Sequence, residues 1–512
     1  MFIKVLMLVI FFGVMVGVGL YCRKHSTDVN GFVLGGRSVG PWLTAFAYGT
    51  SYFSAVIFIG YAGQFGWKFG LASTWIGLGN AFIGSLLAWV ILGKRTRLMT
   101  QHLESKTMPE FFGNRFDSNM LKVVASLIVF IFLIPYTASL YNGLSRLFGM
   151  AFNLDYTICI IVMAVLTGIY VIAGGYMATA INDFIQGIIM IIGIVAVILS
   201  VLKSNGGFIA ALDSLARVED ATASSTPGVF ASFFGPDPFS LLCVVILTSL
   251  GTWGLPQMVQ KFYAIKDEGS IHKGTVISTI FALVVAGGCY FLGGFGRLYS
   301  DQIDIAANGY DSVIPTMLQN LSPGLIALVV ILVLSASMST LSSLVIASSS
   351  TLTIDFLKGK FMKKMDDKQQ LLSIRILVVV FIAISAIIAL IQYKSSVTFI
   401  AQLMGISWGA LAGAFLAPFL YSLYWKKTTK IACWASFVFG VGLMMVNMFA
   451  KSVLPKLLQS PINSGAIAML AGLVIVPVVS LITKAPDNDF VEETFACYEK
   501  KHEVSQKTAL ND

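Results

Sequence analysis

Charged residues are scarce in this sequence. Asp, Glu, Lys and Arg make up 12% of its 512 residues, about half of the roughly 25% found in average soluble proteins. Hydrophobic residues make up 57%, and the mean hydropathy is +0.83. This shortage of charge excludes a soluble multidomain protein, and the unbroken apolar runs exclude the alternating pattern of a transmembrane β-barrel. We therefore predict an all-α polytopic membrane protein.

Groups suited to catalysis or metal binding are also few. The four histidines lie outside the long apolar runs, at positions 25, 102, 272 and 502, and the six cysteines form no CxxC pair. We interpret the cysteines as small buried hydrophobes without disulfides or bound metal. An intramembrane hydrolase or a proton relay needs a buried histidine or paired carboxylates. The sequence therefore argues against an enzyme and, less strongly, against proton coupling, because Asp183 could carry a proton.

The apolar runs are long enough to cross a bilayer, which takes about 20 residues. They predict thirteen spans: 3–22, 42–66, 70–93, 121–148, 155–178, 181–203, 239–263, 274–299, 322–355, 373–393, 397–424, 431–450 and 464–483. The first continues to Leu20 without a signal-peptidase pattern, so we interpret it as a retained helix. The ninth is too long for an upright span and must tilt or extend into water.

Lysine and arginine predict the orientation, because they concentrate on the cytoplasmic side. With alternating connections, 25 of the 34 basic residues fall on one side, Lys261 among them. This places the N-terminus outside and the C-terminus inside a multi-pass protein of the cell membrane. The net charge of +9 then reflects topology, and no nucleic-acid partner is predicted. We expect the polar tail after Ala485 to be disordered.

Neutral oxygen atoms are concentrated in the ninth span. Ser339, Ser342 and Ser343 follow i, i+3, i+4 spacing and share one helix face. Hydroxyls and backbone carbonyls are suitable ligands for a hard cation such as Na⁺. The alternative is ordinary packing, because small residues dominate helix interfaces in membranes and serines can bond to the preceding turn.

Two spans are interrupted near their middle, by Gly49–Ser54 in the second and by Gly251–Pro256 in the seventh. Interrupted helices free backbone carbonyls, and many carriers build their binding sites there. Glycine and proline are also common in membrane helices generally. The five-span separation predicts a 5+5 inverted repeat of spans 2–6 and 7–11. The predicted regions are an extra helix at 1–22, repeats at 38–203 and 239–424, an extracellular loop at 204–238, two added helices at 425–484 and a cytoplasmic tail at 485–512.

Asp183 has two interpretations. It lies at the start of the sixth predicted span, and Asp183 and Gln186 have the spacing of a capping box. In the first interpretation, Asp183 caps this helix and has no further role. Alternatively, an intramembrane carboxylate facing Ser342 and Ser343 would complete a second cation site.

Five short segments resemble the sodium/solute symporter family when taken in this order and spacing: residues 32–41, 174–186, 254–262, 336–341 and 484–486. The resemblance covers nearly the whole chain and implies the thirteen-helix form of the 5+5 repeat. It also implies a sodium site formed by carbonyls of Thr50, Phe53 and Ala336 with the hydroxyls of Ser339 and Thr340. Some members have a second sodium site, which maps to Asp183, Ser339, Ser342 and Ser343.

The resemblance implies Na⁺-driven import of a small organic solute, an amino acid or small carboxylate. Alternatives are a proton-coupled carrier of the same fold and a transporter-derived membrane sensor. We expect the solute pocket to contain only uncharged residues, namely Ser51, Tyr52, Ser54, Tyr136, Thr252, Trp253 and Gln257, although packing is the simpler role for many of them. Proline carriers of this family have an acid where this chain has Tyr52, and aromatic residues where it has Thr248 and Thr252. The sequence leaves the number of sodium ions and the oligomeric state open.

Overall fold

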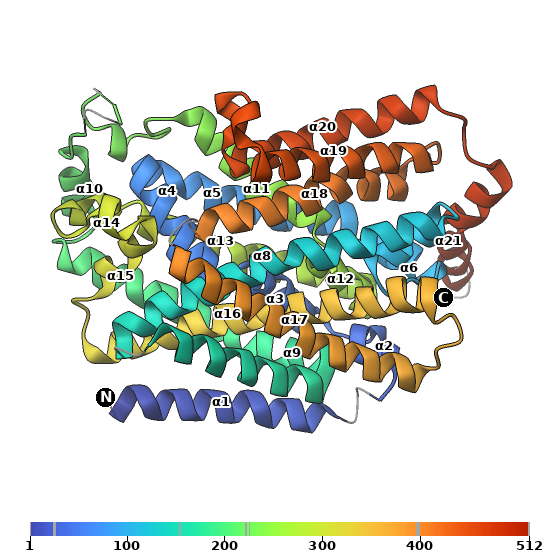
Figure 1. Cartoon of the computed structure of the whole chain (residues 1–512), viewed down its shortest axis with the longest axis horizontal. Helices are drawn as coiled ribbons and strands as arrows, with labels where there is room; N and C mark the ends of the chain where they lie inside the picture. Colours follow the sequence, from blue (N-terminus) through green and yellow to red (C-terminus); the bar gives the residue numbers. More distant parts are fainter. Residues whose placement is uncertain are drawn as a thin grey trace.

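The computed structural model describes residues 2–23, 27–152, 155–220, 223–224, 226–395 and 400–509, and side chains at 2–4, 52, 146, 149–150, 152, 170, 392–395 and 499–509 lie outside that description. These residues form a bundle of helices without any β-sheet. Most of the long helices run along one direction, with α1 on one edge of the bundle and α19 and α20 on the opposite edge (Figure 1). Helices satisfy their own backbone hydrogen bonds, as a membrane interior requires.

Within the described residues, ten helices are long and apolar enough to cross a membrane, and the bent pair α11–α12 makes eleven. One of the ten, Val56–His102, covers the end of the second predicted span and the whole third span, and a shorter apolar helix, Tyr156–Ile169, corresponds to the fifth. All thirteen predicted segments are therefore helical over most of their length, which confirms the all-α polytopic fold.

The spans have the following bounds in chain order: α1 Phe2–Cys22; α3 Pro41–Tyr52 with η3 Val56–Tyr61 and α4 Ala62–Phe69; α5 Thr74–Gly79 with η5 Asn80–Leu87, η6 Trp89–Gly93 and α6 Lys94–His102; α8 Asn119–Phe152; α9 Tyr156–Ser204; α11 Pro238–Gly254 with α12 Pro256–Ala264; α13 Glu268–Gly293; α16 Pro323–Thr351 with η10 Leu352–Phe361; α17 Asp367–Ser395; α18 Ile400–Tyr424; α19 Lys430–Phe449; and α20 Pro461–Ile482. Shorter helices connect them: α2 Val29–Leu34, α7 Met108–Arg115, α10 Phe208–Ala216, α14 Ile305–Asn308, α15 Val313–Leu318 and α21 Asn488–Ala509.

Both predicted interruptions are present. α3 ends at Tyr52 and Phe53 has extended backbone angles, so the chain leaves helical geometry in mid-span. α11 ends at Gly254, Leu255 is extended, and α12 begins at Pro256 with a 45° bend between the two helices. Proline at the first position of a helix lacks only an N–H that would have no helical partner, so Pro256 starts α12 at little cost.

α16 is the central helix of the bundle. It packs against α8, α9 and α3, and every residue from Val329 to Thr351 is buried. The serine-rich run, for which packing was the alternative interpretation, therefore has no face toward lipid. The helix continues through η10 to Phe361, so the ninth span extends beyond an upright crossing, as expected from its length.

Close backbone contacts depend on glycine at a few positions. A Cβ on Gly66 of α4 would lie 2.0 Å from the carbonyl oxygen of Gly293 in α13, and a Cβ on Gly254 would lie 2.8 Å from atoms of α18. Small residues at such crossings let membrane helices approach closely. These contacts hold the two interrupted spans tightly against their neighbours.

Two expectations from the sequence were wrong in detail. The fifth and sixth spans follow one another in α9 and meet at a kink, where Gly175 has non-helical backbone angles. Asp183 lies eight residues beyond this kink, inside the second part of α9, so it does not cap a helix. The tail is ordered where it is described: α21 packs on α6, with Phe495 buried and Tyr498 Oη 3.4 Å from the carbonyl oxygen of Arg95. The connection at 204–238 includes a short helix, α10.

Candidate functional site

An oxygen cluster lies where α3 is interrupted. The hydroxyl of Thr340, in α16, is 3.2 Å from the carbonyl oxygens of both Thr50 and Phe53 and 3.1 Å from that of Ala336. A hydroxyl has one proton to donate, so it satisfies only one of these three carbonyls at a time. Three carbonyl oxygens thus converge on a single hydroxyl, an arrangement of oxygen atoms that a small hard cation can stabilise.

Ser339 completes this cluster. Its hydroxyl donates to Thr50 Oγ1 at 2.7 Å, and Thr50 Oγ1 in turn donates to the carbonyl of Phe46 at 2.8 Å. All five residues of the first predicted sodium site thus lie together, and each is at most 1% exposed. The interruption of α3 supplies two of the carbonyls, because Phe53 is extended and the helical ladder stops there. The geometry is that of a neutral cluster of oxygen atoms.

The second group of predicted ligands lies one turn further along α16. Ser343 Oγ is 2.8 Å from Ser51 Oγ, whereas Ser342 donates back to the carbonyl of Ser339 at 2.8 Å. Asp183, in α9, is fully buried, and neither of its carboxylate oxygens has a hydrogen-bond partner among the described residues. Lys261 is near enough to act on this carboxylate through its charge, and Ser339 through its hydroxyl.

Lys261 is a buried charged residue beside the candidate site that sequence reasoning missed. It was counted with the basic residues of the cytoplasmic side, but its side chain is only 2% exposed, and its ammonium donates to Ser343 Oγ at 3.0 Å. The available signal was its position five residues after Pro256, inside an interrupted apolar span, where a charged residue is expensive and functional by default.

The predicted solute-binding residues divide into two sets. Ser51 contacts Ser343. The Tyr136 hydroxyl lies near Ser54 but has no hydrogen-bond partner among the described residues. Both side-chain polar atoms of Gln257 also lack a partner there. Buried polar groups without protein partners are available to a bound solute. Thr252 and Trp253 instead donate to the carbonyls of Gly84 and Ile83 in the third span, so these two side chains are engaged away from the cluster. The Tyr52 side chain lies outside the described residues.

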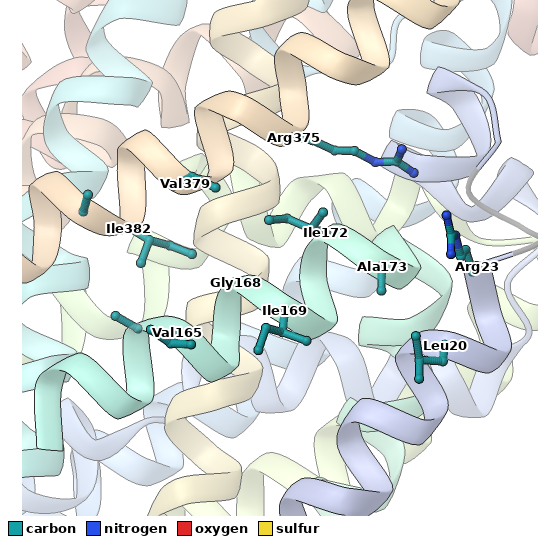
Figure 2. Close-up of a pocket in the computed structure, with 12 residues that line it drawn as sticks. Leu20, Arg23, Val165, Gly168, Ile169, Ile172, Ala173, Arg375, Val379 and Ile382 are labelled. Atoms are coloured by element: carbon teal, nitrogen blue, oxygen red, sulfur yellow. The ribbon is translucent and has the colours of Figure 1, made fainter.

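A large groove, with a volume of about 630 Å³, lies elsewhere, between α1, α9 and α17. Its lining is apolar, with Arg23 and Arg375 side by side at one end (Figure 2). It does not include any predicted ligand of Na⁺ or solute. A more polar pocket of about 500 Å³ lies near Gln64, Asp237 and Gln459, at the end of the bundle that contains α10 and α15.

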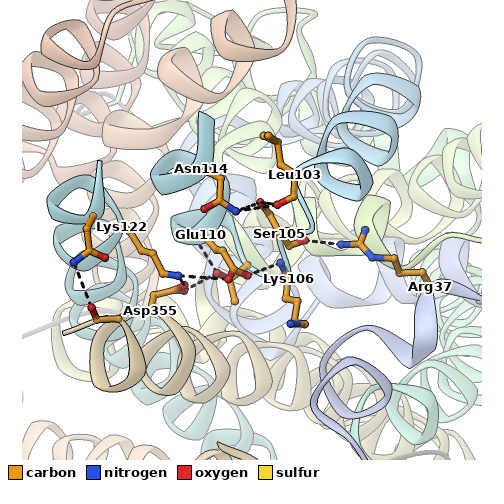
Figure 3. A network of polar contacts seen from close by, with 11 residues as sticks. Arg37, Leu103, Ser105, Lys106, Glu110, Asn114, Lys122 and Asp355 are labelled. Carbon is orange, nitrogen blue, oxygen red and sulfur yellow. Dashed lines mark hydrogen bonds and ion pairs between the residues drawn. The ribbon is translucent and has the colours of Figure 1, made fainter. Parts of the chain in front are cut away.

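A polar network (Figure 3) lies at the opposite end of the bundle, where α2 and α6 are found (Figure 1). Arg37 donates to the carbonyls of Ser105 at 2.6 Å and Tyr263 at 3.2 Å, and burial lowers the pKa of its guanidinium from the ordinary value. Lys122 lies 3.4 Å from Glu110 Oε1 and 3.6 Å from Asp355 Oδ1. These contacts join α12, α7, α8 and η10, which belong to both halves of the fold.

Comparison with known proteins places this geometry in context. A profile of the sodium:solute symporter family matches residues 32–440. The osmoregulated proline transporter OpuE of Bacillus subtilis is 28% identical over 481 residues, 93% of this chain and 94% of its own, and the sodium/proline symporter 2 of Staphylococcus saprophyticus is 29% identical over 86% and 85%. A solved structure of an outward-open Na⁺-coupled sialic acid symporter superposes with a TM-score of 0.73 at 16% identity, over 95% of this chain and 99% of that one.

Proposed function

The chain belongs to the sodium:solute symporter family, and from this premise we propose that it imports a small organic solute by Na⁺-coupled symport. One observation carries the proposal: the cluster of three carbonyls around the Thr340 hydroxyl. Neutral oxygen ligands favour a monovalent hard cation, and none of the five residues of this cluster has a carboxylate or imidazole that could accept and release a proton. This supports sodium over the proton-coupled alternative.

We assign the coupling ion to the site formed by Thr50, Phe53, Ala336, Ser339 and Thr340. The ligands come from α3 and α16, which lie in different repeats of the fold. An ion between them therefore stabilises whichever conformation keeps these two helices together. If that conformation is the one that binds solute, sodium raises the affinity for solute and solute raises the affinity for sodium by the same factor. Asp183, Ser339, Ser342 and Ser343 form the candidate second site for a cation.

The solute is an amino acid or a small carboxylate in this proposal. Two curated relatives are named as proline transporters, which makes proline the first compound to test. The side chains of Ser51, Ser54, Tyr136 and Gln257 are themselves uncharged, which suits a zwitterion, whose opposite charges cancel. The departures at Tyr52, Thr248 and Thr252 from the pattern of proline carriers favour a solute that differs from proline.

Transport would proceed by alternating access, in which one helix bundle rocks against the other. The network around Arg37 and Lys122 closes one end of the bundle, which we take as the cytoplasmic end because of its basic residues. In this orientation the N-terminus is outside the cell membrane and the C-terminus inside.

The test is uptake into proteoliposomes that contain the purified full chain. A panel of radiolabelled amino acids and small carboxylates is offered under an inward Na⁺ gradient, an inward H⁺ gradient or neither. We expect one or a few compounds to accumulate only with the Na⁺ gradient. Accumulation driven by H⁺ and indifferent to Na⁺ would refute the proposal in favour of the proton-coupled carrier. Thr340→Ser, which keeps the hydroxyl, is the matched control for variants of the sodium site.

A further inference from the structure

A lysine ammonium is buried beside the second cation site. Lys261 belongs to α12, all of whose residues are buried. Its Nζ lies 3.0 Å from Ser343 Oγ and 5.0 Å from the centre of the Tyr176 ring. A lysine in membrane-buried surroundings needs an anion, a hydrogen-bond acceptor or an aromatic face to compensate for lost hydration. The Lys261 side chain is buried in the candidate second cation site and does not extend toward water.

Asp183 supplies the compensating charge. Asp183 and Lys261 are both buried beside the serines of α16, and Lys261 Nζ contacts Ser343 there. Their opposite charges act on each other without a direct ion pair among the described residues. Neither carboxylate oxygen of Asp183 has a hydrogen-bond donor in the part of the chain that the structure describes. An uncompensated charge in such a position is strongly unfavourable, so each of the two buried charges offsets the cost of burying the other.

The hydroxyls around Lys261 are oriented to accept its protons. Ser51 donates to the carbonyl of Ala47 at 2.5 Å, so its lone pairs are free for the proton of Ser343 at 2.8 Å. Ser343 then presents its own lone pairs to the ammonium of Lys261. A sodium ion at this position would require the same lone pairs of Ser343 and the same negative charge of Asp183.

One carboxylate balances one positive charge. From this geometry we infer that the ammonium of Lys261 is the resident cation of the second site, tethered to α12, and that it excludes a second sodium ion. The protein then couples solute to a single Na⁺, held at the Thr340 cluster. This inference rests on the sodium-coupled transport proposed above, but it concerns how many ions bind and can fail while that function stands.

The experiment counts bound sodium. Purified full-length protein is titrated with radiolabelled Na⁺ in a scintillation-proximity assay, and the same preparations are assayed for Na⁺-dependent uptake in proteoliposomes. We expect one ion per wild-type protein and a hyperbolic dependence of uptake on Na⁺. Lys261→Met removes the charge at similar volume and leaves Asp183 without a partner, so we expect two bound ions and a sigmoidal dependence.

Two further variants make the result specific. Lys261→Arg keeps a positive charge and should still bind one ion, and the double variant Lys261→Met/Asp183→Asn removes both charges and should return from two ions to one. Two ions bound to the wild type, or one bound to a folded Lys261→Met variant, would overturn the inference. If Lys261→Met does not fold, the number of sodium ions bound per wild-type protein tests the inference by itself. Loss of all sodium dependence in wild-type uptake would instead refute the proposed function, and the binding count would still be read independently.

Discussion

Replacement of Thr340 by valine tests the sodium site most directly. Valine has nearly the shape of threonine but lacks the hydroxyl, whose oxygen lies within 3.2 Å of the carbonyls of Thr50, Phe53 and Ala336. The variant therefore removes one of the five proposed ligands and leaves the backbone carbonyls in place. Because Thr340 is fully buried, water cannot easily replace the lost oxygen.

The size of the effect follows from this contact. Loss of a buried polar partner costs about 1–3 kcal/mol, which corresponds to a roughly 5- to 150-fold change in affinity. The ion-free protein also loses the one hydrogen bond that the hydroxyl donates, worth about 1 kcal/mol. Because the ion-free protein loses this hydrogen bond too, that part of the free energy does not lower the affinity for Na⁺. We therefore expect the Na⁺ concentration for half-maximal uptake to rise about tenfold, in the lower part of the 5- to 150-fold range.

The assay is initial-rate uptake in proteoliposomes at increasing Na⁺, with Thr340→Ser as the control that restores the hydroxyl. The protection that Na⁺ gives against thermal unfolding supplies a second readout that does not depend on knowing the solute. A Thr340→Val protein that folds and keeps its Na⁺ dependence within about twofold of wild type would mean that the cluster does not bind the coupling ion.

Other substitutions test the same reasoning at separate places. Ser339→Ala should also raise the Na⁺ concentration for half-maximal uptake, about fivefold to tenfold, with wild-type expression as the check on folding; an unchanged value would remove Ser339 from the site. Gly66→Ala should lower thermal stability by about 2–4 kcal/mol because its Cβ would lie 2.0 Å from the Gly293 carbonyl oxygen, whereas Gly13→Ala, with open space around it, should be neutral; equal melting temperatures would contradict the packing. In Arg37→Lys, the single ammonium cannot reach the carbonyls of both Ser105 and Tyr263, so this end of the bundle should open more often. A cysteine introduced on the inner side of the network should then react faster with a membrane-impermeant thiol reagent applied from the cytoplasmic side. An unchanged reaction rate would mean that Arg37 does not hold this end closed.

Hydrophobicity along the chain was sufficient to predict the spans. Backbone groups in lipid must be satisfied within their own segment, so an apolar run of about 20 residues has little choice but to form a helix. The interruptions at Phe53 and Leu255 were also predictable, because glycine and proline act locally. The position of the bend at Gly175 and the ordered helix α21 were not, since both depend on what packs against them: Gly175 lies against Phe32, and α21 against α6.

The site shows the same division. Helical spacing predicted that Ser339, Ser342 and Ser343 share a face. The resemblance supplied Thr50 and Phe53 as partners of Ser339, and Asp183 as the partner of Ser342 and Ser343. Only the folded chain decided that Thr340 lies within hydrogen-bond distance of three carbonyls, that Ser342 is occupied by its own helix, and that Thr252 and Trp253 contact the third span. Lys261 is the clearest case. A count of basic residues on each side of the membrane assigns a charged residue near a span end to the aqueous side. Its burial depends on Asp183 and Ser343, which lie 78 and 82 positions away in sequence and meet it only in the tertiary structure.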